Sequence, residues 1–165
     1  MRTIAVSFCL LISISAWGQS MKDLSNKDRI KFFYEKLSKD SLQLVDEFYH
    51  PQVEFIDPVG PIKGADKIKK YYANMYANVK TIKFDFSEYY ESGNNVVAVW
   101  KMTLQTDKLN SGETFSVDGN SVIKFDDSGK AIYHRDYFDM GAFIYEKIPV
   151  VGFVVKKIKE RMKAE

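Results

Sequence analysis

The sequence has few of the residues that carry recognisable chemistry. Its 165 residues include one cysteine and two histidines, His50 and His134. A single cysteine cannot form an internal disulfide, which excludes a small disulfide-stapled fold. The histidines stand in no spacing with carboxylates that is typical of a metal site, and the chain has no glycine-rich phosphate loop and no nucleophile elbow. We therefore expect neither a metal nor an organic cofactor.

Net charge is also small. The 24 basic and 22 acidic residues leave a formal charge of +2. This balance gives no positive field of the kind that attracts nucleic acid, so we expect no nucleic-acid partner. By contrast, 45% of the residues are hydrophobic and 15% are aromatic, which excludes a disordered chain. A domain of this length buries roughly two-thirds of its unfolded surface, enough for a core with an internal pocket.

The first residues are typical of a secretory signal. Arg2 precedes an apolar run over residues 4–14, and the small residues Ala16 and Gly18 follow. The run is too short to span a bilayer, which takes roughly twenty residues. The pattern predicts a signal peptide over residues 1–18 that is cleaved after Gly18, with export to the periplasm or the extracellular space. An ordinary N-terminal helix is the alternative.

Beyond the signal, helical patterns come first and strand patterns follow. Residues 25–48 carry two helical patterns, which we expect Pro51 to end. A short strand over residues 53–57 and a third helix that opens at Gly64 come next. From residue 82 to residue 139, apolar positions alternate between turns, as in a meander of strands.

This order predicts an α+β fold in which a curved antiparallel sheet wraps around N-terminal helices. One domain over residues 25–140 accounts for all of these patterns. Within the meander, we expect Asp118-Gly119 to interrupt the strand pattern of residues 114–125, because glycine weakens a strand interior.

Two segments give the chain a family resemblance. Val53-Glu-Phe-Ile-Asp-Pro-Val-Gly60, followed by Gly64 and Tyr71-Tyr-Ala-Asn74, resembles the bacterial ketosteroid isomerases, and the similarity extends more weakly over residues 27–139. Tyr133-His-Arg-Asp-Tyr-Phe-Asp139 resembles a segment of SnoaL-like proteins. The resemblance implies the cone-shaped, cystatin-like α+β barrel that these proteins share with limonene-epoxide hydrolases and nuclear transport factor two. It also implies a homodimer formed through the outer sheet.

The resemblance implies that Asp57 is a base that shuttles protons. Removing a proton from a carbon beside a ketone requires a carboxylate near that carbon, within an apolar wall. Phe55 lies on the same strand face as Asp57 and would form part of this wall. Tyr72 matches the family's supporting tyrosine, which hydrogen-bonds into the site. The alternative for Asp57 is a cap of the turn at Pro58, because Asp-Pro favours turns.

The hydrogen-bond donors of the isomerases are not all present. Their first-helix tyrosine falls on Phe33, which cannot donate, while Tyr34 is rotated by about 100° around the helix. Their late-strand aspartic acid falls near Ser121, which alternation places on the apolar face of its strand. Such donors are typically worth two or three orders of magnitude in rate, so steroid isomerisation itself is disfavoured. Tyr34 and Ser121 remain candidate binding residues.

The last strand supplies a second acid–base candidate. Alternation puts His134, Asp136 and Phe138 on one face, and Asp136 matches an aspartate that acts on substrate in cyclases and epoxide hydrolases of the resembled superfamily. His134 and Asp136 could share a proton relay; the alternative for His134 is a buried, hydrogen-bonded strand residue. No Arg-x-Asp pair lies near Trp100, so epoxide hydrolysis is disfavoured. Trp100 is a candidate pocket residue or plain core.

Residues 141–165 form a C-terminal extension with an amphipathic pattern. Pro149 and Gly152 are expected to divide it into two pieces. Its end, residues 156–165, carries five basic and two acidic groups. One interpretation is a helix that lies on a membrane surface, and the other is a lid on the barrel mouth or on a dimer mate. The basic excess is small, which favours the lid.

Two functions are compatible with these observations. The first is a small exported enzyme, an isomerase or a cyclase, that moves a proton on a hydrophobic carbonyl or polyketide-like substrate without a cofactor. In it Asp57 is the base, Tyr72 belongs to the donor network and Asp136 is a second acid–base group. The second is a non-catalytic pocket that binds an apolar small molecule or a protein partner. Asp57 facing a void together with a hydroxyl or a second carboxyl favours catalysis; a filled void favours binding.

Overall fold

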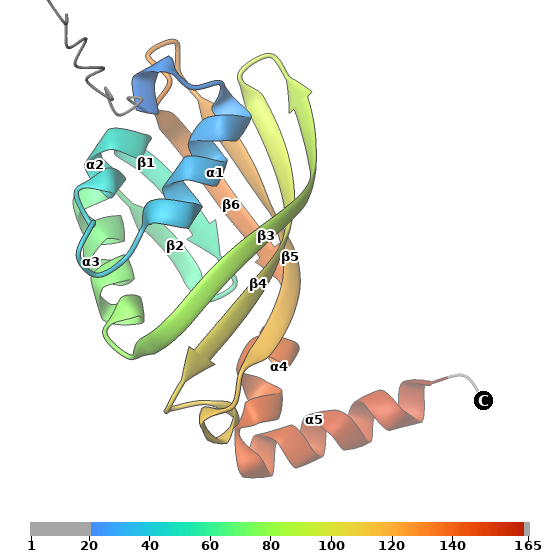
Figure 1. Cartoon of the computed structure of the whole chain (residues 1–165). Coiled ribbons are helices and arrows are strands. Elements are labelled where there is room, and N and C mark those ends of the chain that lie inside the picture. The colour runs from blue at the N-terminus through green and yellow to red at the C-terminus, as the bar shows by residue number, and fades with distance from the viewer. Residues whose placement is uncertain (1–20, 164–165) are drawn as a thin grey trace, which may run out of the picture.

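The computed structural model describes residues 21–163, and over that range a curved six-stranded sheet packs against helices on one of its faces (Figure 1). The strands are β1 (Tyr49–Asp57), β2 (Gly60–Lys63), β3 (Val79–Ser92), β4 (Asn95–Thr106), β5 (Phe115–Phe125) and β6 (Ala131–Phe138). The helices that pack against the sheet are α1 (Asn26–Lys36), α2 (Leu44–Phe48) and α3 (Ala65–Tyr76). Two further helices, α4 (Met140–Phe143) and α5 (Pro149–Met162), follow the last strand.

The predicted α+β fold is confirmed, although the sheet is mixed and not wholly antiparallel. The strand order is β2-β1-β6-β5-β4-β3, and β1 and β6 are the one pair of neighbours that runs parallel in the described part of the chain. In that pair Ile56 is in register with Arg135. The next residues, Asp57 and Asp136, therefore lie at the same level on strands that are about 4.8 Å apart. The parallel pairing brings together two carboxylates that are distant in sequence.

Aromatic residues fill the space between the helices and the sheet. Ser25 caps α1 by accepting a hydrogen bond from the backbone N–H of Asp28. Phe33 of α1 stacks on Phe48 of α2 with ring centroids 4.3 Å apart, and both rings are completely buried. Such a phenylalanine typically stabilises a fold by about 3–5 kcal/mol relative to alanine. Phe33 therefore belongs to the core, while its neighbour Tyr34 is left to face the site.

Two strands differ from the sequence-based prediction. β1 begins at Tyr49 and includes Pro51, which is tolerated because the pairing with β6 is irregular between Tyr49 and Glu54. Gly119 does not interrupt β5, which continues through it opposite Trp100. A Cβ at Gly119 would lie 2.3 Å from the indole ring of Trp100. The glycine therefore makes room for that ring and does not end the strand.

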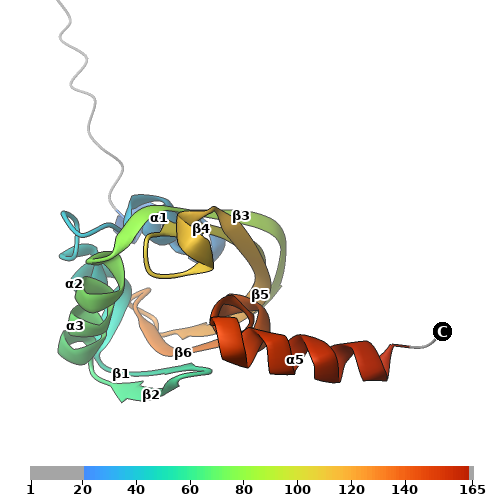
Figure 2. The ribbon, with the colours of Figure 1, turned by 90° about the horizontal axis from the view of Figure 1, so that it is seen from below.

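The C-terminal segment agrees with the prediction at Pro149 and differs from it at Gly152. Pro149 divides the segment, because α5 begins there and its missing N–H breaks no helical hydrogen bond in the first turn. Gly152 lies inside α5, against the backbone of Glu146, and does not break the helix. α4 packs on the sheet through Phe143, whereas α5 packs on the short turn Tyr145–Lys147 and projects away from the rest of the molecule (Figure 2). No helix in the described range is long and apolar enough to cross a bilayer.

The predicted signal peptide, residues 1–18, lies outside the described residues. Its cleavage after Gly18 and the export of the chain stay predictions from the sequence pattern.

Candidate functional site

A cavity of about 50 Å³ lies between the sheet and helices α1 and α3. Its wall is largely aromatic, and its two charged groups are the carboxylates of Asp57 and Asp136. The lining residues are Tyr34, Phe55, Asp57, Tyr71, Tyr72, Met75, Phe84, Trp100, Met102, Asp136, Phe138 and Phe143. Such a site suits a ligand with an apolar body and a polar group that meets the carboxylates.

A second hollow of about 410 Å³ lies beside this cavity. Asp57, Asp136 and Phe138 line both spaces, so these three side chains form the boundary between them. Phe143 of α4 lines the inner cavity only, so α4 covers that part of the inner cavity. A ligand that enters from the outer hollow meets the two carboxylates and the ring of Phe138 first.

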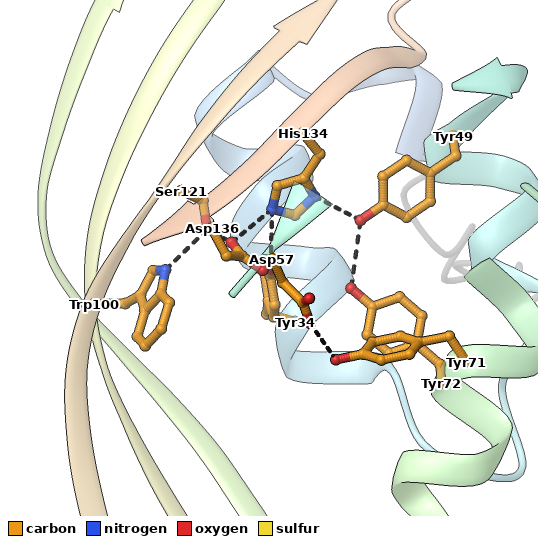
Figure 3. A network of polar contacts seen from close by, with 9 residues as sticks. All are labelled: Tyr34, Tyr49, Asp57, Tyr71, Tyr72, Trp100, Ser121, His134 and Asp136. Carbon is orange, nitrogen blue, oxygen red and sulfur yellow. Dashed lines mark hydrogen bonds and ion pairs between the residues drawn. The ribbon is translucent and has the colours of Figure 1, made fainter. Parts of the chain in front are cut away.

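Asp57 is the last residue of β1 and is buried, with 6% of its surface exposed. Its Oδ1 accepts hydrogen bonds from the backbone N–H groups of Val59 (2.8 Å) and Gly60 (3.0 Å). Its Oδ2 accepts a hydrogen bond from the hydroxyl of Tyr71 (2.6 Å; Figure 3). Asp57 thus caps the turn at Pro58 and lines the cavity at the same time. Three hydrogen bonds therefore hold this carboxylate in place, and both of its oxygens are engaged.

Asp136 on β6 has one engaged and one unengaged oxygen. Its Oδ1 accepts hydrogen bonds from the Ser121 hydroxyl (2.5 Å) and from Nε2 of His134 (2.9 Å). Its Oδ2 has no hydrogen-bond partner among residues 21–163. The indole N–H of Trp100 donates to the Ser121 oxygen at 2.9 Å, which leaves the serine proton for Asp136. Two donors therefore hold one oxygen of Asp136, and the other is available to a ligand.

His134 connects Asp136 to the helical layer. The ring is completely buried, and the Tyr49 hydroxyl lies 2.6 Å from its Nδ1 and the Tyr34 hydroxyl 3.2 Å from its Nε2. The tautomer that satisfies these contacts accepts from Tyr49 at Nδ1 and carries its proton on Nε2, directed at Asp136. The Tyr72 hydroxyl lies 3.4 Å from that of Tyr49. His134 is thus a buried, hydrogen-bonded strand residue and also a link in a continuous chain from Tyr72 to Asp136 (Figure 3).

Burial raises the pKa of each tyrosine in this network. Loss of hydration is the largest cause for Tyr34, Tyr49, Tyr71 and Tyr72, because the phenolate would be held away from water. The negative charge of Asp136 raises the pKa of Tyr34 and Tyr72 further. At neutral pH these four hydroxyls keep their protons, so they can donate hydrogen bonds but cannot act as bases.

The structure places the sequence-predicted residues in one region. Those that line the cavity are Asp57, Tyr72, Asp136, Tyr34, Phe55 and Trp100. Ser121 and His134 are completely buried behind it and both donate to Asp136. Tyr34, and not Phe33, faces the cavity, so α1 presents a different residue from the one at the isomerase tyrosine position. No group of three or more metal-ligating side chains capable of holding an ion occurs in the described part of the chain.

Two residues of the network were missed from the sequence. Tyr71 stands beside the predicted Tyr72, and its position in the Tyr-Tyr-Ala-Asn motif was the available signal. Tyr49 lies where α2 ends and β1 begins, and no motif marks it. The direction of a side chain at such a junction depends on how the two elements meet, which the local sequence does not specify.

Gly119→Ala is expected to destabilise the fold by about 1–3 kcal/mol, because the added methyl group would overlap the Trp100 ring. The displaced indole would also lose its hydrogen bond to Ser121. Urea unfolding of both proteins measures the difference. In a Trp100→Leu background, Gly119→Ala should lower the free energy of unfolding by much less. An equal loss of stability in both backgrounds would show that the Trp100 ring is not the cause.

Comparison with known proteins shows which family the chain resembles. A family model for SnoaL-like domains matches residues 30–134. Searching curated protein sequences yields no significant match. Among solved structures, TerC co-crystallised with polyporic acid is 25% identical with a TM-score of 0.61, over 72% of this chain and 94% of that one.

Two further structures are similar in fold. A protein described as a SnoaL-like polyketide cyclase from Jannaschia sp. CCS1 is 17% identical with a TM-score of 0.64, over 72% of this chain and 88% of that one. A protein with a ketosteroid isomerase-like fold from Catenulispora acidiphila DSM 44928, in complex with trimethylamine, is 11% identical with a TM-score of 0.62, over 72% and 89% of the two chains. At these identities the likeness concerns the fold alone.

Proposed function

The chain belongs to the SnoaL-like family, and from that membership and the geometry of the cavity we propose that it binds a hydrophobic carbonyl compound and transfers a proton on it. The observation that carries the proposal is the Asp136 carboxylate, held at Oδ1 by Ser121 and His134 and unengaged at Oδ2. A carboxylate held in this way beside an apolar cavity can accept a proton from a bound ligand without first giving up a hydrogen bond. TerC was co-crystallised with polyporic acid, which supports a small-molecule ligand for this chain as well.

The reaction needs one base and one hydrogen-bond donor. Oδ2 of Asp136 takes a proton from a carbon beside the ligand carbonyl, and the electron pair of the broken C–H bond forms an enolate. The negative charge develops on the carbonyl oxygen, where the Tyr34 hydroxyl can donate a hydrogen bond. Tyr34 lines the cavity. Because Nε2 of His134 carries its own proton, the Tyr34 hydroxyl does not donate to it and can donate to a ligand. Return of the proton from Asp136 to another carbon gives an isomer. Attack of the enolate carbon on a second carbonyl instead closes a ring, and the alkoxide oxygen that forms takes the proton from Asp136.

Asp57 is the base that the resemblance implies, and that assignment stays a prediction. Its Oδ2 already accepts a hydrogen bond from Tyr71, and its Oδ1 accepts two from the turn. Each carboxylate oxygen has two lone-pair positions. Tyr71 uses one of those on Oδ2 of Asp57, whereas within the described residues both are open on Oδ2 of Asp136. We therefore place the base at Asp136 and assign Asp57 to holding Tyr71 and the turn between β1 and β2.

The size of the inner cavity limits how a ligand binds. A space of about 50 Å³ is well below the roughly 150 Å³ of a cavity that accepts benzene. A ligand with several rings can place its carbonyl end inside while its body lies in the outer hollow of about 410 Å³. Deeper entry requires Phe138 and Phe143 to move.

A thermal-shift screen with steroid, terpenoid and polyketide ketones tests this proposal. A ligand at about 100 times its dissociation constant stabilises the folded state by roughly 2.7 kcal/mol, which raises the melting temperature of a domain of this size by about 5–10 °C. Each hit is then followed by NMR in D2O for exchange of the protons beside its carbonyl. Exchange above the buffer rate supports the proposal. Binding without exchange would support non-catalytic binding, and no hit among the three classes would contradict a hydrophobic carbonyl ligand.

Export and self-association complete the proposal. We propose export on the basis of residues 1–18, and mass spectrometry of the mature chain should find Gln19 as its first residue. Light scattering on the purified chain tests the homodimer that the family resemblance implies.

A further inference from the structure

The C-terminal helix carries an unusual share of the exposed hydrophobic surface. Of the twelve large hydrophobic residues that are exposed in the described part of the chain, eight fall between residues 145 and 162. Val150, Phe153 and Met162 are exposed by 77%, 68% and 80%. A concentration of apolar side chains at one place on the surface marks an interaction site.

Most of the surface of α5 is accessible to a binding partner. Its 14 residues form a rod about 21 Å long, which packs on the preceding turn and then leaves the body (Figures 1 and 2). At about 100° per residue, Val151, Val154, Ile158 and Met162 share one face of this rod. The expected lid on the barrel is formed by α4, whose Phe143 lines the cavity, and not by α5.

Positive charge accompanies this apolar face. Four exposed cations on α5 and just after it make no ion pair within residues 21–163: Lys156, Lys157, Arg161 and Lys163. Lys159 differs because Asp139 and Glu146 hold it. Glu160 is the one acidic residue of α5. The end of the chain thus presents an apolar strip with unneutralised cations beside it.

We propose that α5 docks on the surface of an anionic lipid bilayer. The apolar strip enters the boundary between headgroups and acyl chains, and the cations face the lipid phosphates. The helix is too short to span a bilayer, which takes about twenty residues, so it lies in the plane of the surface. This inference goes beyond the proposed function and does not depend on it.

A bilayer suits this surface better than a second copy of the chain does. A copy would offer the same apolar strip, but it would bring a second set of unneutralised cations close to the first. An anionic bilayer supplies both an apolar layer and negative charge. Docking would also hold α4, and with it the cavity wall at Phe143, next to the lipid.

A fluorophore on α5 tests the proposal. In the full chain with Cys9→Ser, Ile158→Cys at the centre of the strip is labelled with the polarity-sensitive dye NBD and mixed with vesicles of phosphatidylcholine alone or with one-quarter phosphatidylglycerol. We expect NBD emission to shift to shorter wavelength with the anionic vesicles, and the shift to shrink in 0.5 M NaCl. A label at Lys67→Cys on α3 should not shift. Because every variant shares residues 1–20, differences between the labels report on α5.

Charge reversal supplies the second arm of the test. Lys156→Glu with Lys157→Glu should weaken vesicle binding at least about tenfold, whereas the matched pair Lys67→Glu with Lys70→Glu should leave it unchanged. Absence of a shift at position 158, or equal binding by both double variants, would overturn the proposal. A dimer in light scattering that Ile158→Asp dissociates, without vesicle binding, would assign the face to a second copy.

Discussion

Asp136→Asn is expected to slow proton exchange on a responsive ketone by about 10²–10⁴-fold, the usual contribution of a general base. Asparagine has the shape of aspartate and keeps one oxygen for Ser121 and His134, which both donate to Oδ1. It lacks the second, unengaged oxygen that takes the proton. The rate is measured by NMR in D2O on a ligand from the thermal-shift screen. The melting temperature and the affinity for the ligand should change little, because the packing around the side chain is preserved.

Asp57→Asn is the matched comparison for this measurement. If Asp57 holds Tyr71 and the turn, as its three hydrogen bonds indicate, exchange should stay within about tenfold of the original protein, well short of the loss expected for a base. If Asp57→Asn abolishes exchange while Asp136→Asn does not, the base implied by the family resemblance is the right one and our assignment is wrong. Unchanged exchange in both variants would refute proton transfer by either carboxylate.

The free energy of unfolding is expected to fall steeply above pH 10. Tyrosine in an unfolded chain has a pKa near 10, whereas burial raises the pKa of Tyr76 to about 12 in the folded protein. The pKa values of Tyr34, Tyr49, Tyr71 and Tyr72 are also raised, chiefly by burial. Above pH 10 the unfolded chain therefore binds fewer protons than the folded one. The stability that these tyrosines contribute is complete below pH 10 and is lost as the pH rises toward their folded pKa values.

Each such tyrosine removes up to about 1.4 kcal/mol of stability per pH unit. Because a domain is stable by about 5–15 kcal/mol in total, a few of them acting together unfold it within roughly one to three pH units. Urea unfolding followed by circular dichroism between pH 8 and pH 11.5 measures this slope. A midpoint that stays constant up to pH 11.5 would contradict the prediction.

Tyr76→Phe tests the origin of the slope. Tyr76 is buried and its hydroxyl makes no hydrogen bond to the described residues, so its removal should barely change stability at pH 7. It should reduce the loss per pH unit above pH 10 by up to about 1.4 kcal/mol. A slope that is the same in Tyr76→Phe as in the original protein would show that this tyrosine is not a cause of it.

Much of the site could be predicted from strand alternation in the sequence alone. Side chains in a strand alternate between the two faces, so the positions of His134, Asp136 and Phe138 on one face could be predicted from their spacing, and so could the inward direction of Ser121. The turn at Asp57 was equally predictable, because Asp-Pro directs a local hydrogen-bonding pattern. These are properties of a few consecutive residues.

What the tertiary structure decided depends on contacts between distant segments. The parallel pairing of β1 with β6 sets Asp57 beside Asp136, and the packing of α1 turns Tyr34 to the cavity and Phe33 to the core. Tyr71 of α3 engages the Oδ2 oxygen of Asp57. Ser121 and His134 both donate to Oδ1 of Asp136 and leave its other oxygen unengaged. The sequence by itself determined which residues carry the chemistry and which face of its own strand each occupies, because alternation and turn formation are local. Only the packing of distant elements decided which of these groups meet and which oxygen stays available, because hydrogen bonds between elements form only once the sheet is assembled.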